Sequence, residues 1–271
     1  MAVVISDALA LVEATGVPLT HARIGWRNVV RDAVVTATSE TAGFPVSSLK
    51  NPLTYDRWLP SSLPATVTID AGVAVPVDYV GVAAHLLSDG AVSVTVAYLD
   101  EATPPGTWTE VAAELPGDNG TILFLVPEVF ARWWRLTFEG ATPQPVGVVY
   151  LGRALAMQRP IYQGHAPLTL SAETVIRPQR SEGGQFLGRS IIRGGFKTRA
   201  AFSNLQAAWV RSEFDPFIKS ARSYPFFFAW RPGPYPKEVG YVWTSEDIVP
   251  SNSGPRDLME VSFEVRGLGD G

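Results

Sequence analysis

The chain has 271 residues, of which 46% are hydrophobic and 18% are charged, and its formal net charge is −4. This negative balance provides no basic field to hold nucleic acid or an anionic membrane surface. The absence of cysteine excludes disulfides, thiolate catalysis and cysteine-ligated zinc. The length suits two domains, and so few charges indicate a surface that other subunits cover.

The first 19 residues are apolar but include Asp7 and Glu13, and they lack the basic start of a signal peptide. No apolar run in the sequence reaches the length that a membrane-spanning helix needs. We therefore expect residues 1–19 to form an N-terminal arm and expect no insertion into a membrane.

Residues 20–155 predict a β-sandwich. Short segments alternate between apolar and polar residues, and turn signals such as Asp89-Gly90 separate them. Many short strands at regular spacing are typical of sandwiches. The predicted strands cover residues 35–39, 65–72, 77–84, 92–99, 121–127, 132–140 and 146–155.

Residues 156–271 predict a smaller α+β unit. A strand comes first and leads into a basic stretch, where the Gly183-Gly184 and Gly194-Gly195 pairs predict turns or a flexible loop. One helix is predicted in SNLQAAWVRSEFDPFIKSA, with Ser203 or Asn204 as its cap and a kink or restart at Asp215-Pro216.

Three more strands follow the helix. The last, LMEVSFEVRGL, alternates so that Met259, Val261, Phe263 and Val265 share one face. The fold class is therefore mainly β, with a sandwich followed by an α+β unit that has one main helix.

The stretch YPFFFAWRPGPYP (residues 224–236) is apolar on both faces of its predicted strand. A strand of this kind must be covered on both sides. The helix can cover one face, and the other must meet the N-terminal domain or another subunit. The alternative is a buried core strand and a rigid loop without a partner. The candidate assembly residues are Phe226, Phe228, Trp230 and Tyr235, together with the basic Arg189 and Arg193.

No catalytic pattern is recognisable. The sequence contains no GxSxG, no HExxH and no phosphate-binding glycine loop. The three histidines, His21, His85 and His165, are far apart in the sequence. We expect no catalytic residues, no metal and no cofactor, although two of the 26 acidic residues could form a hydrolase pair.

The N-terminal segments resemble, in their order, the galactose-binding-like jelly roll of discoidin domains and carbohydrate-binding modules. They are GFPVSSLKNPLTYDRWLPSSLPATVTIDAG, VDYVGVAAH, SVTVAYLD with GTWTEVA, FARWWRLTF and VGVVYLGRAL. The resemblance implies a sugar site at one end of the sandwich, for which Tyr55, Trp58, His85 and Trp108 are the candidates. Alternatively, the tryptophans fill or flank the core and His85 is a hydrogen-bonded structural residue.

Some members of that family bind calcium through an acidic residue in the loop before the tryptophan and a glutamate near the closing strand. Here Asn51 stands in the loop, and Val149 and Tyr150 stand in the closing strand. The resemblance therefore does not extend to a calcium site.

The C-terminal segment is similar to the distal tail and baseplate-hub proteins of long-tailed bacteriophages. A basic glycine-punctuated hairpin region (GGQFLGRSIIRGGFKTRA), a tryptophan-containing helix, the strand YPFFFAWRP and an alternating last strand follow in that order. This resemblance implies a tail protein of the virion, made in the host cytoplasm, that forms a trimeric or hexameric ring with itself and contacts other tail proteins. The sandwich could then contact a host surface glycan. The alternative is a carbohydrate-binding module protein.

Overall fold

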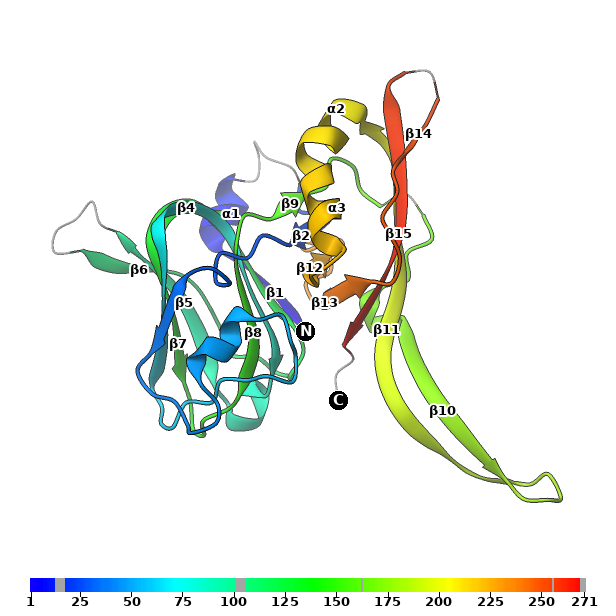
Figure 1. Ribbon diagram of the computed structural model, residues 1–271, viewed down its shortest axis with the longest axis horizontal. Coiled ribbons are helices and arrows are strands. Elements are labelled where there is room, and N and C mark those ends of the chain that lie inside the picture. Colours follow the sequence, from blue (N-terminus) through cyan, green and yellow to red (C-terminus); the bar gives the residue numbers. More distant parts are fainter. Residues whose placement is uncertain (13–17, 101–105, 162, 255, 269–271) are drawn as a thin grey trace.

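The computed structural model describes residues 1–12, 18–100, 106–161, 163–254 and 256–268. Residues 13–17 of the predicted N-terminal arm, with Glu13, lie outside this part. The structure is mainly β, as predicted, with a β-sandwich on one side and a second sheet with its helix on the other (Figure 1).

The sandwich contains seven strands in the order β3-β4-β7-β5-β6, with β8 paired to β4 and β1 paired in parallel to β7. Two pairs of predicted strands are each one long strand: residues 65–72 and 77–84 join in β4, and residues 121–127 and 132–140 join in β7. The strands are β1 (Ala2–Ile5), β3 (Val34–Ala37), β4 (Ala65–His85), β5 (Ser93–Asp100), β6 (Thr107–Glu114), β7 (Ile122–Glu139) and β8 (Val146–Gly152).

The register of β4 against β7 shifts between Asp70 and Val75. Beside this irregularity Arg132 of β7 holds Asp70 of β4 with two hydrogen bonds of 2.6 and 2.7 Å. These bonds keep the pKa of the Asp70 carboxyl below its ordinary value. The irregularity is thus braced by a bidentate ion pair, a geometry that arginine favours.

The second sheet has the order β10-β11-β15-β13-β12-β2-β9, and β14 pairs with β15. Val261, Phe263 and Val265 of the alternating last strand lie buried on one face, as predicted. The strands are β2 (Arg23–Gly25), β9 (Leu155–Ala156), β10 (Ala172–Arg180), β11 (Phe186–Gln206), β12 (Phe226–Ala229), β13 (Val239–Thr244), β14 (Ser251–Asn252) and β15 (Leu258–Leu268).

The sheets do not follow the predicted boundaries at residues 20 and 155. β1, expected in a separate arm, belongs to the sandwich sheet, and β2, expected in the sandwich, pairs with β12 and β9 of the second sheet. The polypeptide therefore starts in the sandwich, crosses to the second sheet, returns to build the sandwich, and enters the second sheet again. Such short strands carry too little alternation for the sequence to assign them to a sheet.

The helical segment begins later than predicted. Ser203 and Asn204 still belong to β11, where Asn204 has a positive φ of 59° beside a register shift. The segment comprises α2 (Ala207–Trp209), a π-helical turn (Val210–Phe214) and α3 (Asp215–Ala221), whose first turn holds Pro216. The other α-helix in the described part of the chain is α1 (Asp7–Val12), and the 3-10 helices are Val46–Lys50, Leu87–Gly90 and Leu168–Leu170. No helix among the described residues has the length and apolarity needed to span a bilayer.

Strand β12 lies between two hydrophobic clusters. Phe226 and Phe228 pack into the cluster under the helical segment, which includes Phe217. Phe227 and Ala229 pack the other way, into a cluster that they share with the outer face of the sandwich. All four side chains of β12 are fully buried. The covering of both faces that the sequence predicts is thus achieved within one chain.

Tyrosines complete the junction between the two units. Tyr150 of β8 donates a hydrogen bond to the carbonyl of Pro225 (3.2 Å), and Tyr241 of β13 donates one to the carbonyl of Pro52 (2.9 Å). Each unit therefore donates a buried hydroxyl to the backbone of the other. Satisfied polar groups of this kind hold two packed layers in one orientation.

Gly81 of β4 lies in close contact with the ring of Phe227 at this junction. A Cβ atom at Gly81 would lie 2.6 Å from that ring. We expect Gly81→Ala to lower the free energy of unfolding by about 1–3 kcal/mol, the usual effect of overpacking. Denaturant unfolding measures the change.

The control is Gly117→Ala, because no atom lies within 4 Å of a Cβ atom at Gly117. Gly81→Ala should also have a smaller effect in a Phe227→Ala background, since the ring that it meets is gone. Equal effects in both backgrounds would show that this contact does not govern the junction.

Candidate functional site

The hairpin of β10 and β11, called the arm from here on (residues 172–194), is exposed along nearly all of its described residues. Its strands pair from Ala172 with Phe196 to Arg180 with Phe186. It projects away from the rest of the molecule (Figure 1). Gly184, with a φ of 81°, lies in the tip turn that the sequence predicts. The Gly194-Gly195 pair is not a turn but part of β11, opposite Thr174 and Glu173.

The arm carries large apolar side chains in solvent. Phe186 is 70% exposed, Leu187 63% and Ile191 63%. These residues come in adjacent pairs along the strand, and successive side chains of a strand point to opposite faces. Both faces of the two-stranded ribbon are therefore apolar and uncovered. The exposed apolar side chains of the arm are Val175, Ile176, Phe186, Leu187, Ile191 and Ile192.

The arm also differs in charge from the rest of the chain. Residues 172–194 contain four arginines and two glutamates, a formal charge of +2, whereas the whole chain carries −4. The remaining residues thus carry −6. The arm is therefore a basic segment of an otherwise acidic chain.

Ion pairs hold the base of the arm to β15. Lys197 lies 2.8 Å from Glu264, and Arg266 lies 3.6 Å from Glu173 of β10. Hydrogen bonds from Lys197 and Arg266 lower the pKa of the Glu264 carboxyl. The base is therefore fixed in direction, and the projecting part of the arm has no such support among the described residues.

The predicted assembly residues lie in three different environments. Phe226 and Phe228 are fully buried inside the chain and present no surface to another copy. Arg189 lies exposed on the arm. Arg193 pairs with Val175 in the same hairpin, and its side chain is outside the described part.

Trp230 and Tyr235 form a cluster of their own after β12. Their rings stack at 5.3 Å with an interplanar angle of 8°, and Arg231 lies over both. Trp230 also donates a hydrogen bond to Glu238, and Tyr235 remains 44% exposed. The proline-rich segment thus folds back on itself, and only the edge of this cluster is free.

The four predicted sugar-binding residues do not form one site. Trp58 is fully buried in the sandwich core, with Phe138 as a ring neighbour at 5.3 Å. Arg135 covers Trp108, with its guanidinium 3.7 Å from the ring centroid. His85 is buried, its Nδ1 accepts a hydrogen bond from the Leu87 N–H, and burial lowers its pKa to about 4. Trp58 and His85 are thus enclosed by the protein, and Trp108 is partly buried beneath Arg135.

Tyr55 is the exception, because its side chain is 79% exposed on a loop of the sandwich. Asp56 braces this loop by accepting hydrogen bonds from Ser48 (2.8 Å) and Asn51 (2.6 Å). Asn51 thus supports the loop through a hydrogen bond. Tyr55 is an exposed aromatic ring on a supported loop.

Sequence reasoning missed the apolar surface of the arm. The signal is present in FLGRSII, where apolar residues occur as neighbours within a polar, glycine-rich stretch. A strand with neighbouring apolar residues has two apolar faces, as in YPFFFAW. The interpretation as a basic loop stressed the arginines instead.

The described residues contain no group of three histidine, aspartate or glutamate side chains that could hold a metal ion. Neither a scan of protein-family models nor a search of curated proteins finds a match.

Solved structures similar to part of the chain include several carbohydrate-binding modules. Chitosan-binding module 1 of a chitosanase/glucanase from Paenibacillus sp. IK-5 is 20% identical, with a TM-score of 0.40, and the match covers 47% of this chain and 99% of the module. The module CpGH89CBM32-5 from Clostridium perfringens, in complex with GalNAc-β-1,3-galactose, is 11% identical, with a TM-score of 0.40 over 46% of this chain and 99% of the module. At TM-scores below 0.5, these likenesses do not indicate what this chain binds.

Proposed function

We propose that this chain is a non-catalytic structural protein that assembles with copies of itself through the arm. The observation that carries the proposal is the arm itself, whose two faces both expose large apolar side chains. An isolated two-stranded hairpin is marginally stable in water. A contiguous exposed apolar surface marks an interaction site.

The magnitude of the apolar burial favours a closed ring. Burying the four most exposed of these side chains, Phe186, Leu187, Ile191 and Ile192, contributes about 6–12 kcal/mol, at roughly 1.5–3 kcal/mol each. Association costs about 4–15 kcal/mol in lost freedom and side-chain ordering. One arm contact alone is therefore weak. In a ring the arm of each copy docks on the next copy, so each copy takes part in two contacts. Such head-to-tail contacts form a closed ring when the rotation between neighbouring copies permits it.

The assembly that we propose is the tail tip of a long-tailed bacteriophage. The order of hairpin, helix, aromatic strand and alternating last strand is the basis for this choice. The protein would be made in the host cytoplasm and incorporated in the virion tail as a ring of three or six copies, in contact with other tail proteins.

Substitutions on the arm should abolish self-association. We expect the wild-type chain to reach a trimeric or hexameric mass as its concentration increases, and the Leu187→Asp, Ile192→Asp double variant to remain a monomer. Light scattering over a concentration series measures the mass. At concentrations where the wild-type chain is still monomeric, the variant should unfold at the same denaturant midpoint, because both side chains are exposed in the single chain.

Phe130→Asp is the matched control, since Phe130 is 67% exposed on β7 of the sandwich. It should assemble as the wild type does. A wild-type chain that stays monomeric at every concentration would contradict self-assembly.

A second candidate function is recognition of a surface glycan by the sandwich. The observation that favours it is Tyr55, an exposed aromatic ring on a loop that Asp56 braces. Aromatic rings bury large apolar areas and can keep a polar group in solvent. A host glycan would be the partner in a tail, and a polysaccharide would be the partner in a carbohydrate-binding protein outside a virion.

Tyr55→Ala should remove glycan binding without unfolding the chain, because the ring makes little contact with the core. A glycan array with the full chain, wild type and variant, tests this expectation. Phe44→Ala, at a loop residue that is 44% exposed, is the control. Binding that both variants retain would place the glycan elsewhere, and an array without any binding would refute this second function.

A further inference from the structure

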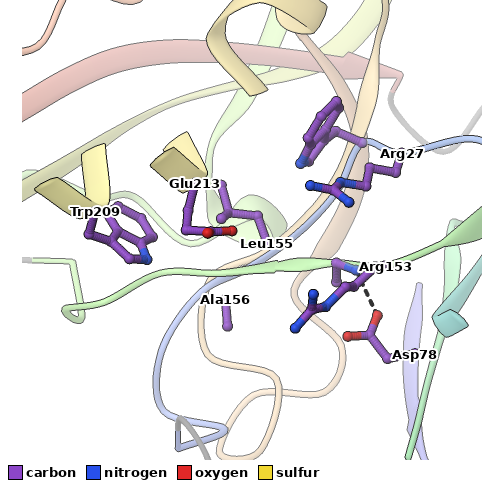
Figure 2. A pocket seen from close by; sticks show the side chains of 9 residues that line it. Arg27, Asp78, Arg153, Leu155, Ala156, Trp209 and Glu213 are labelled. Atoms are coloured by element: carbon purple, nitrogen blue, oxygen red, sulfur yellow. Dashed lines mark hydrogen bonds between the residues drawn. The ribbon is translucent and has the colours of Figure 1, made fainter. Parts of the chain in front are cut away.

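A cavity of about 290 Å³ lies at the junction of the two units (Figure 2). It is separate from the arm and from the Tyr55 loop. Two tryptophans and four charged residues form much of its wall. They are Trp26, Arg27, Asp78, Arg153, Trp209 and Glu213.

The sandwich supplies Asp78 from β4 and Arg153 from the residue after β8. The Asp78 carboxylate accepts a hydrogen bond of 2.6 Å from the N–H of Ala154. Arg153 is held from outside the cavity wall by Glu128, at 2.9 Å. Both polar groups are therefore fixed in position before any ligand arrives.

The helical segment supplies Trp209 and Glu213 from the opposite side. Trp209 directly precedes the π-helical turn that contains Glu213, and such a turn is a distortion that is frequent at functional sites. Trp209 stacks on Phe214 at 5.8 Å with an interplanar angle of 26°. In Figure 2 Glu213, Arg27 and Arg153 are directed into the same space.

These groups suit a ligand without net charge. Two guanidinium groups and two carboxyl groups surround the cavity, so an anion or a cation would meet a like charge as well as an opposite one. Burial also raises the pKa of Asp78 to about 6, which favours its neutral form in acid. Among the described residues, Glu213 has no ion-pair partner and the Trp209 indole N–H has no acceptor. The Glu213 carboxylate can therefore accept a hydrogen bond from a ligand, and the Trp209 indole N–H can donate one.

We propose that this junction pocket binds a neutral sugar of one or two rings. A sugar ring presents C–H groups that pack on an aromatic face and hydroxyls that both donate and accept hydrogen bonds. Trp209 would take the C–H face, because the Arg27 guanidinium already lies over the Trp26 ring, 5.1 Å from its centroid. The carboxyl groups would accept from hydroxyls, and the guanidinium groups would donate to them. The volume is near the lower end of the roughly 300–1,000 Å³ that is usual for small-molecule pockets.

The test uses the full chain and neutral probes: methyl β-glucoside, methyl β-galactoside, N-acetylglucosamine, cellobiose and lactose. Ligand-observed NMR detects binding, and tryptophan fluorescence measures the dissociation constant. We expect at least one probe to bind and Glu213→Gln to weaken it about tenfold, because a hydrogen bond to a charged acceptor is lost. Glu213 is exposed, so the variant should unfold at the wild-type midpoint.

Glu246→Gln is the matched control, since Glu246 is an exposed carboxylate outside the pocket. It should bind as the wild type does. Binding that Tyr55→Ala removes and Glu213→Gln leaves intact would assign the sugar to the loop and overturn the proposal. Failure of every neutral probe to bind would overturn it as well, as would preferential binding of acetate or methylammonium.

Discussion

The structure depends on strand β12, a run of four fully buried residues with apolar side chains on both faces. Such a strand cannot form a stable edge in water, because either uncovered face would expose phenylalanine rings. The helical segment covers Phe226 and Phe228, and the sandwich covers Phe227. Gly81 allows the Phe227 ring to approach the sandwich backbone. The two units are therefore held together by a shared core rather than by a linker.

This arrangement satisfies β12 inside one chain and leaves the arm as the element without cover. Phe186, Leu187 and Ile191 lie beyond the reach of either unit, on a ribbon that Lys197 and Glu264 anchor at its base. The apolar surface that the low charge content indicates is thus found on the arm and not on β12. Self-assembly is consequently proposed to use the projecting hairpin, while β12 provides the rigid body that carries it.

The sequence predicts well what local periodicity controls. Sandwich strands β3, β4, β5, β7 and β8, the two-faced character of β12 and the burial of Val261, Phe263 and Val265 follow from alternation, whereas β1 and β6 are not predicted as strands. It fails where tertiary context decides. Short strands such as β2 join a distant sheet, and the helix starts at Ala207 because β11 continues to Gln206.

The candidate site was only partly predictable for a related reason. Trp58 and Tyr55 are both aromatic, and the sequence does not show which of them is exposed. The fold buries Trp58 and exposes Tyr55. Likewise, the junction pocket gathers residues from four separate parts of the chain, among them Asp78, Arg153 and Glu213. No spacing in the sequence indicates that they meet.

Self-assembly as we propose it requires the arm to dock on another copy of the chain. Amide hydrogen exchange of residues 176–192, followed over a range of protein concentrations, tests it most directly. An unsupported hairpin opens readily, so these amides should exchange fast in dilute protein and slowly in concentrated protein, while those of β12 stay protected throughout. Exchange in the arm that does not change with concentration would contradict the claim.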